Sequence, residues 1–140
     1  MTQVLLLRVN GNPPMRFQLP VGEQTSLVFG GARVLAAAMP ADELDRLLEG
    51  VEDFPLASGF VLDRGEFLEG LRAIRARGYA LGQGQHEVGT ISVTVPVYDP
   101  EGGVVAAIQL SGMIEDIPID VDNLVIELKQ ASGAITRRMT

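Results

Sequence analysis

The sequence predicts an α+β fold with an antiparallel sheet, and two observations support this. Two runs, 90–98 and 104–111, alternate aliphatic with mostly small polar residues, which is the period of a strand with one apolar and one hydrophilic face. A Gly-rich connection, 99–103, joins these runs into a hairpin. Along the chain, strands come first, helices follow, and further strands lead into a last helix. This order is typical of α+β folds and not of βαβ repeats.

The length and composition of the chain indicate one globular domain. Of the 140 residues, 46% are hydrophobic, which suits an ordinary core. The longest apolar runs fall far short of the ~20 residues that cross a bilayer, and no signal-peptide pattern opens the chain, so we expect a cytoplasmic protein without a membrane partner. The absence of cysteine excludes disulfides and thiolate metal sites. The formal net charge of −7 argues against direct binding to nucleic acid, which requires a basic surface.

The N-terminal half is predicted to hold a hairpin followed by two helices. The predicted strands are 2–9 and 15–19. The first helix begins at a cap, Thr25 or Ser26, and runs through Ala38. The second helix is 41–48, and its inward-facing residues are Leu44, Leu47 and Leu48. Pro40 ends the first helix. Residues 51–61 are predicted to be irregular, and they are apolar enough to form a wall over a pocket.

Two further helices and a short strand are predicted in the C-terminal half. Asp63 with Glu66 has the spacing of a capping box, and the helix that it starts runs to about Arg77, with Gly78 closing it. A short strand, 79–81, follows. Asp120 caps a last helix that ends near residue 138, and its apolar stripe would cover the aliphatic face of the sheet. The two predicted stripes are Phe67, Leu71 and Ile74 in the first helix, and Val121, Leu124, Leu128, Ala131 and Ile135 in the last.

Four polar residues on the two central strands are candidates for a binding site. Ser92, Thr94, Gln109 and Ser111 share the hydrophilic face of the hairpin. One interpretation is a solvated sheet face, which antiparallel sheets commonly have. The other is the floor of a small-molecule pocket covered by other elements. The alternation alone favours the solvated face.

Gly30 and Gly31 lie at or inside the start of the first predicted helix, where each costs up to ~1 kcal/mol relative to alanine. One explanation is close packing of the helix on the sheet. The other is a ligand held by unpaired backbone N–H groups at the helix start. Arg33, one turn further, either supplies a charge to such a ligand or points to water.

No catalytic or metal-binding arrangement is found in the sequence. His86 is the one histidine, and it lies in a polar turn without the partners that a general base or a metal site requires. The chain contains no Gly-x-Ser-x-Gly elbow, P-loop or His-Glu-x-x-His motif. We therefore predict no catalytic residue, no metal site and no cofactor. An enzyme is the less favoured class of protein.

An ordered set of short motifs resembles the effector-binding domain of the IclR family of bacterial transcriptional regulators. It covers the chain from about Val4 to the C-terminus. The motifs are 19–22 (Leu-Pro-Val-Gly), Gly30-Gly31 with 34–36 (Val-Leu-Ala), 40–44 (Pro-Ala-Asp-Glu-Leu), 75–80 (Arg-Ala-Arg-Gly-Tyr-Ala), Gly89, 95–97 (Val-Pro-Val), the turn 99–102 (Asp-Pro-Glu-Gly) and the strand end 111–112 (Ser-Gly).

The resemblance implies a GAF-like antiparallel sheet with helices on both faces. The last helix would cover one face, and a ligand cavity would lie under the middle helices on the other, where the polar row is. The implied ligand contacts are the Gly30-Gly31 backbone, the loop at Gly82, and the side chains of Ser92, Thr94, Gln109 and Ser111. The implied partners are a small metabolite, either an organic acid or an aromatic compound, and further copies of the chain in a homodimer or tetramer.

The sequence departs from the family pattern in two places and covers only part of the usual domain organisation. The turn 82–85 reads Gly-Gln-Gly-Gln and lacks the acidic residue often found there, and Gln109 replaces a small hydroxyl residue. The 140 residues are expected to form one effector domain without its first helix and strand and without the DNA-binding domain. Two alternatives remain: a dimerisation module of the same fold that binds no ligand, and a small uncharacterised enzyme.

Overall fold

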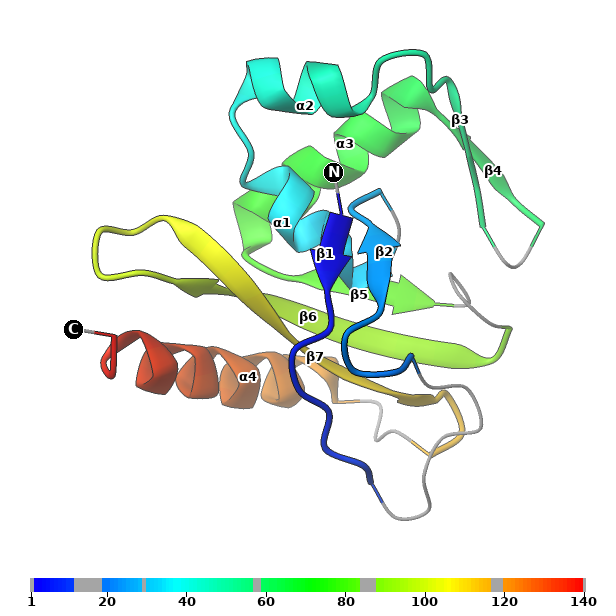
Figure 1. Ribbon diagram of the computed structural model, residues 1–140. Coiled ribbons are helices and arrows are strands. Elements are labelled where there is room, and N and C mark those ends of the chain that lie inside the picture. The colour runs from blue at the N-terminus through cyan, green and yellow to red at the C-terminus, as the bar shows by residue number, and fades with distance from the viewer. Residues whose placement is uncertain are drawn as a thin grey trace.

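We analysed a computed structural model that describes residues 2–11, 19–28, 30–56, 59–83, 88–116 and 120–139. A three-stranded antiparallel sheet in the order β5-β6-β7 lies at its centre (Figure 1). The strands are β5 (Ala80–Gln83), β6 (Thr90–Tyr98) and β7 (Val104–Met113). Strand β6 has the predicted bounds, and the predicted hairpin is confirmed, with β7 continuing past Ser111 to Met113.

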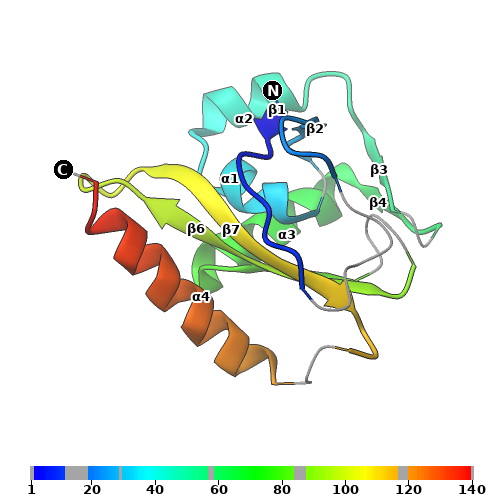
Figure 2. The ribbon, with the colours of Figure 1, turned by 60° about the horizontal axis from the view of Figure 1, so that its bottom comes forward.

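Helices cover both faces of this sheet (Figure 2). Helix α4 (Val121–Thr136) packs on β6 from one side. The short 3-10 helix η1 (Gly30–Ala32) and helix α1 (Arg33–Ala37) lie on the other side, and helix α3 (Arg64–Arg77) packs on α1. Helix α2 (Ala41–Leu47) lies farther from the sheet. The predicted α+β class, with helices on both faces of an antiparallel sheet, is confirmed.

Helix α3 is built as its sequence predicts. The Asp63 carboxylate accepts a hydrogen bond from the Glu66 backbone N–H at 2.8 Å, and the Glu66 carboxylate accepts one from the Asp63 N–H at 2.9 Å, which completes the capping box. Gly78 ends the helix in the left-handed conformation, with φ at 81°. The buried stripe of Phe67, Leu71 and Ile74 enters the core between the helices and the sheet.

The segment 51–61 differs from the predicted irregular wall. Strand β3 (Asp53–Pro55) pairs with β4 (Val61–Asp63) as an antiparallel ribbon. Phe54, in the middle of β3, is buried and stacks on Phe67 with ring centroids 4.1 Å apart. Each strand has three residues, too few to show an alternating pattern. The segment thus covers α3 and the core.

The N-terminal prediction is wrong in two respects. Strand β1 ends at Val4 (Thr2–Val4), and it pairs with β2 (Gln24–Ser26). Residues 15–18 of the predicted second strand, 15–19, lie outside the described residues. Thr25 and Ser26 are strand residues and cap no helix. Gly30 has a φ of +57°, in the left-handed region, so a continuous α-helix cannot run through it from Thr25 or Ser26 to Ala38.

Helix α4 begins as predicted but turns a different side to the sheet. The Asp120 carboxylate accepts a hydrogen bond from the Asn123 N–H at 3.1 Å, so Asp120 is the cap. The helix ends at Thr136, and its buried residues are Val125 and Ser132, whereas Ala131 and Ile135 of the predicted stripe are exposed. Ser132 points inward because its hydroxyl donates to the Pro96 carbonyl oxygen at 2.7 Å.

Two features are absent from the described residues. No helix there is both long and apolar enough to span a bilayer. No group of three or more His, Asp or Glu side chains in the described part of the chain could hold a metal ion. His86 lies outside the described residues.

Candidate functional site

The predicted polar residues form a hydrogen-bonded row across β6 and β7. Thr94 lies opposite Gln109 in the strand register, and Ser92 lies opposite Ser111. Thr94 Oγ1 donates to Gln109 Oε1 at 3.2 Å, and Gln109 Nε2 donates to Ser111 Oγ at 2.6 Å. We call the four residues Ser92, Thr94, Gln109 and Ser111 the polar row. The hairpin register alone brings them together.

Gly31 packs directly against the buried end of the polar row. A Cβ atom at Gly31 would overlap both Gln109 Oε1 and Thr94 Oγ1. Gly30 and Gly31 are both buried. Gly31 therefore fits the close-packing explanation, and what it packs on is the pair of polar side chains that the sequence singled out.

Gly82 lies at the far edge of the same row. It is buried in β5 and stands opposite Ser92 in the register, so Gly82, Ser92 and Ser111 follow one another across the three strands. The register therefore places Gly82 at the polar row. The Gly30-Gly31 turn lies at the same row through the packing of Gly31. The side chains of the polar row are all neutral.

The polar row is buried at one end and open at the other. Thr94 is 1% exposed, Ser92 and Ser111 are half-buried, and Gln109 is exposed. A buried hydroxyl is stable only with a hydrogen-bond partner, and Gln109 Oε1 provides it. The Gln109 amide therefore links the buried hydroxyl of Thr94 to the more accessible hydroxyl of Ser111. Together these groups offer neutral donors and acceptors, suited to a polar group on a small molecule.

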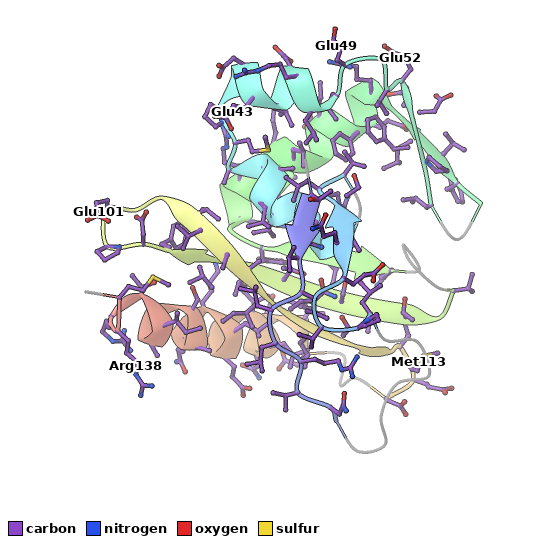
Figure 3. The ribbon with its side chains drawn as sticks, viewed as in Figure 1. Glu43, Glu49, Glu52, Glu101, Met113 and Arg138 are labelled. Atoms are coloured by element: carbon purple, nitrogen blue, oxygen red, sulfur yellow. The ribbon has the colours of Figure 1, made fainter. Side chains whose placement is uncertain are left out.

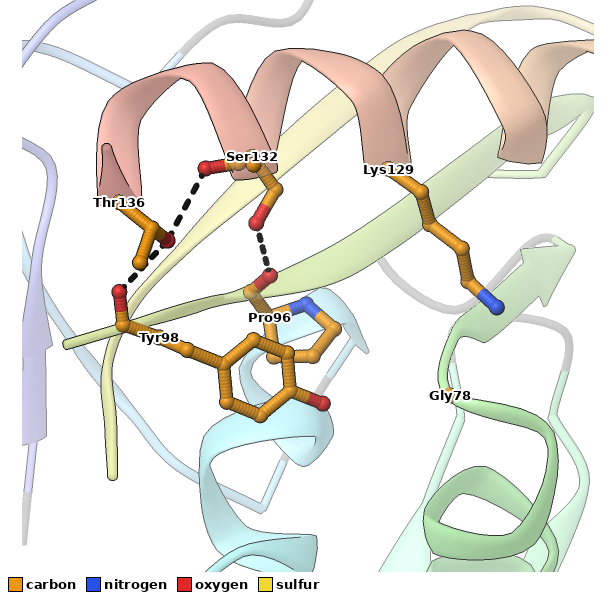
Figure 4. A pocket seen from close by; sticks show the side chains of 7 residues that line it. Gly78, Pro96, Tyr98, Lys129, Ser132 and Thr136 are labelled. Atoms are coloured by element: carbon orange, nitrogen blue, oxygen red, sulfur yellow. Dashed lines mark hydrogen bonds between the residues drawn. The ribbon is translucent and has the colours of Figure 1, made fainter. Parts of the chain in front are cut away.

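Two surface cavities lie away from the polar row. One, of about 300 Å³, opens between α4 and β6 (Figure 4). A second, of about 160 Å³, lies toward the C-terminal ends of α1 and α3. They share Gly78, Pro96 and Tyr98, and none of the seven predicted site residues lines either one. In the described structure the space above the buried end of the row is filled by the Gly31 backbone.

The sequence reasoning missed the polar contacts of the larger cavity. Ser132 and Thr136 line it, and each hydroxyl donates at 2.7 Å to a β6 carbonyl, that of Pro96 and that of Tyr98 respectively. Lys129 also lines it, and its Nζ donates to the Arg77 carbonyl at 3.2 Å. The signal was present, because Ser132 and Thr136 are four residues apart and share one helix face. These hydroxyls are used to hold α4 on the sheet.

Arg33 is a half-buried cation beside the Gly30-Gly31 turn. Its Nε donates to the Gly30 carbonyl at 3.1 Å. Burial lowers the pKa of Arg33 from its ordinary value, and the positive charge of Arg77 lowers it further. The structure thus brings a desolvated positive charge close to the predicted site, as one of the two sequence interpretations of Arg33 proposed.

The fold and the site together define a small α+β domain with neutral hydrogen-bonding groups on one sheet face, closed by a glycine turn. The chain belongs to the IclR family of bacterial transcriptional regulators: the model of the IclR C-terminal domain matches residues 2–137. The predicted resemblance is confirmed. The family is one of regulators and not of enzymes, which agrees with the class predicted from the sequence.

Individual relatives agree with this membership. The chain is 32% identical to the HTH-type transcriptional regulator XynR of Escherichia coli over 76% of its length and 43% of that protein. It resembles the crystal structure of Thermotoga maritima IclR with a TM-score of 0.81 at 25% identity, over 94% of this chain and 54% of the other. It also shares the fold of the inducer-binding domain of Acinetobacter PobR, solved with 3-hydroxybenzoic acid, with a TM-score of 0.76 at 21% identity, over 89% and 75%. The chain spans about half the length of the curated relatives that it matches.

Proposed function

We propose that this domain senses a small metabolite at the polar row and passes the binding to a DNA-binding domain or partner. Family membership supports the regulatory role, because XynR is named an HTH-type transcriptional regulator. A single observation supports this location of the binding site: Thr94, Gln109 and Ser111 form a hydrogen-bonded network, and the backbone of Gly31 packs directly on it. In the proposal the chain is one effector domain that acts in the cytoplasm.

The proposed mechanism uses Gln109 as a movable link. Its exposed amide donates to Ser111 and accepts from Thr94. A ligand with a carboxylate or hydroxyl group would replace one of these bonds, at little cost in hydrogen bonding because one partner is exchanged for another. Any shift of the Gln109 oxygen changes what Gly31 packs on. Ligand binding would thus move η1 and α1, which is how the signal would leave the site.

Organic acids and aromatic metabolites are the proposed ligand class. PobR supports this choice, because its inducer-binding domain was solved with 3-hydroxybenzoic acid. Gln109, in place of a small hydroxyl, would narrow the site and change its hydrogen bonding. The ligand of this domain would then differ from those of relatives with a smaller side chain.

A thermal-shift panel of carboxylic acids and aromatic metabolites tests the proposal. A ligand at 100 times its Kd stabilises the folded state by about 2.7 kcal/mol, which for a domain of this size raises Tm by about 10 °C. The shift should be lost in Gln109→Ala and kept in Gln130→Ala, a glutamine that is exposed on α4. If no compound of a broad panel raises Tm, or if both variants respond equally, the sensing role at this site is wrong.

Direct DNA binding by the domain itself is not part of the proposal. The net charge is −7, and the acidic side chains of Glu43, Glu49 and Glu52 lie at the outer edge of α2 and of the segment after it (Figure 3). Such a surface repels phosphate groups. DNA binding would therefore reside in another domain or partner, and a gel-shift assay with this chain alone should show no complex.

A second candidate function is self-association without a ligand. One observation favours it: α4 keeps two large apolar residues in water, with Ile126 53% and Ile135 41% exposed. Because they are nine residues apart, they lie on opposite flanks of the helix. A second copy packing on either flank would cover one of them, giving the dimer or tetramer that the family resemblance implies. Light scattering of the wild type and of the double variant Ile126→Lys, Ile135→Lys decides this, since only an interface on α4 would make the variant monomeric. A monomeric wild type would exclude it.

A further inference from the structure

Arg33 reaches from the start of α1 toward α3 and donates one hydrogen bond within the described part of the chain. A guanidinium has five N–H donors. Its Nε donates to the Gly30 carbonyl at 3.1 Å, and no described residue accepts from the other four or forms an ion pair with the group. The side chain is half-buried, so it has lost part of its hydration, and no carboxylate among the described residues pairs with it. Such a cation gains more from an anion than one in open water.

The surroundings of Arg33 add positive charge. Arg77, at the end of α3, is close enough to lower the pKa of Arg33 further, after the larger effect of burial. The acidic residues of α3 are engaged elsewhere: Glu66 accepts from the Asp63 backbone at 2.9 Å, and Glu69 pairs with Arg72 at 2.7 Å. The Arg33 guanidinium therefore feels the positive charge of Arg77 and forms no ion pair with a described carboxylate.

The Arg33 guanidinium lies against α3 at a position that carries no side chain. Gly70 faces it, and the Nη1 atom lies 3.9 Å from the position that a Cβ would take at Gly70. A guanidinium can hold a carboxylate or a phosphate through two parallel N–H bonds when its edge is free. Nε and one edge are occupied by the Gly30 carbonyl, which leaves the terminal N–H groups for such a ligand.

We propose that Arg33, supported by Arg77, binds a small oxyanion, a carboxylate or phosphate group, between α1 and α3. The net charge of −7 opposes the approach of an anion, so the affinity comes from direct hydrogen bonds to Arg33 and not from the overall field. The site is separate from the polar row but adjoins it. Arg33 holds the Gly30 carbonyl, and Gly31 is the next residue, which packs on Thr94 and Gln109. An anion bound at Arg33 would therefore act on the turn that closes the polar row.

Nuclear magnetic resonance of the whole 140-residue chain tests this site directly. The ¹⁵N–¹H signals of the Arg33 side chain and the Gly31 backbone are followed during separate titrations with inorganic phosphate and acetate at constant ionic strength. Saturable shifts of both signals are expected in the wild type. Arg33→Gln should weaken the affinity, read from Gly31, by at least about tenfold, because two charge-assisted hydrogen bonds are lost. Saturation with acetate but not phosphate would show a carboxylate site, and the reverse a phosphate site.

Three variants separate binding from folding. Arg33→Lys keeps the charge but not the two-pronged geometry, so it should bind more weakly than the wild type and more tightly than Arg33→Gln. Arg77→Gln should weaken binding by a smaller factor, and Arg72→Gln, on the exposed side of α3, should leave it unchanged. Linear, unsaturated shifts, or the same affinity in Arg33→Gln and Arg72→Gln, would overturn the proposal. Because the probes are simple anions, these outcomes do not depend on finding the effector of the polar row.

Discussion

Ser132 donates its hydroxyl hydrogen to the Pro96 carbonyl at 2.7 Å, and this bond joins the last helix to the central strand. Strand β5 pairs with β6 only over residues 91–94, so the β5-side edge of β6 beyond Thr94 has no neighbouring strand. Two hydroxyls of α4, those of Ser132 and of Thr136 one turn later, donate hydrogen bonds to carbonyl oxygens of β6. The helix thus completes the hydrogen bonding of a strand edge that the sheet leaves open.

Replacing Ser132 with alanine should destabilise the fold. The change leaves a buried carbonyl without its donor, which costs about 1–3 kcal/mol. Urea denaturation measures the loss. Gln130→Ala, on the exposed side of the same helix, is the matched control and should stay within about 0.5 kcal/mol of the wild type. Equal stability of the two variants would show that the Pro96 carbonyl does not need Ser132.

Gly31→Ala should be much more harmful than Gly70→Ala. The added methyl group at Gly31 overlaps Thr94 and Gln109, and overpacking of this kind costs about 1–3 kcal/mol. At Gly70 the methyl group has room and helix propensity improves, so a gain of about 0.5–1 kcal/mol is expected. Thermal unfolding of both variants checks this contrast. Adding Gln109→Ala to Gly31→Ala should recover part of the lost stability. If the two substitutions changed the free energy of unfolding in a strictly additive way, this would contradict the packing described here.

Arg75 should matter far more for stability than Arg72. Arg75 joins α3 to the end of α1, with Nε donating to the Ala37 carbonyl at 2.8 Å and Nη2 to that of Met39 at 3.2 Å. Losing two charge-assisted bonds to half-buried carbonyls should cost about 2–3 kcal/mol. Arg72 makes an exposed pair with Glu69, worth no more than about 1 kcal/mol. Denaturant midpoints of Arg75→Ala and Arg72→Ala test this order, which a similar loss in both would refute.

Asp63→Ala should weaken the start of α3. Its carboxylate accepts from the Glu66 N–H at 2.8 Å, and loss of such a cap costs about 1 kcal/mol. Asp45→Ala, exposed in α2, is the matched acidic control. Hydrogen exchange of the Glu66 amide should rise in Asp63→Ala alone. Unchanged protection there would mean that the capping box adds nothing to this helix.

The parts of the fold that sequence predicted correctly are those encoded by local patterns. Strand β6 shows a strict alternation over nine residues, and α3 carries both its cap and its closing glycine. Because a short hairpin turn fixes the register of β6 and β7, the polar row followed from the same pattern. The family resemblance then favoured a covered face of the sheet over a solvated one.

The errors lie where tertiary contacts overrule local patterns. The hydropathy of α4 pointed to Ala131 and Ile135, but a hydrogen bond buries Ser132, and no hydrophobicity pattern can show that. The long apolar run at the N-terminus predicted a strand through Val9, yet pairing ends at Val4 because its partner β2 has three residues. The sequence is equally unable to show that four donors of Arg33 have no acceptor among the described residues, since this depends on where the acidic side chains of α3 point.

The side-chain amide of Gln109 gives the most direct test of the polar row as the binding site. Its ¹⁵N–¹H₂ signals, compared with those of Gln130, are followed while the best compound of the thermal-shift panel is added. We predict saturable shifts of the Gln109 amide and of the Gly31 N–H, with the Gln130 amide unchanged. A compound that stabilises the domain but leaves Gln109 and Gly31 unaffected, while shifting signals elsewhere, would contradict the assignment of the site.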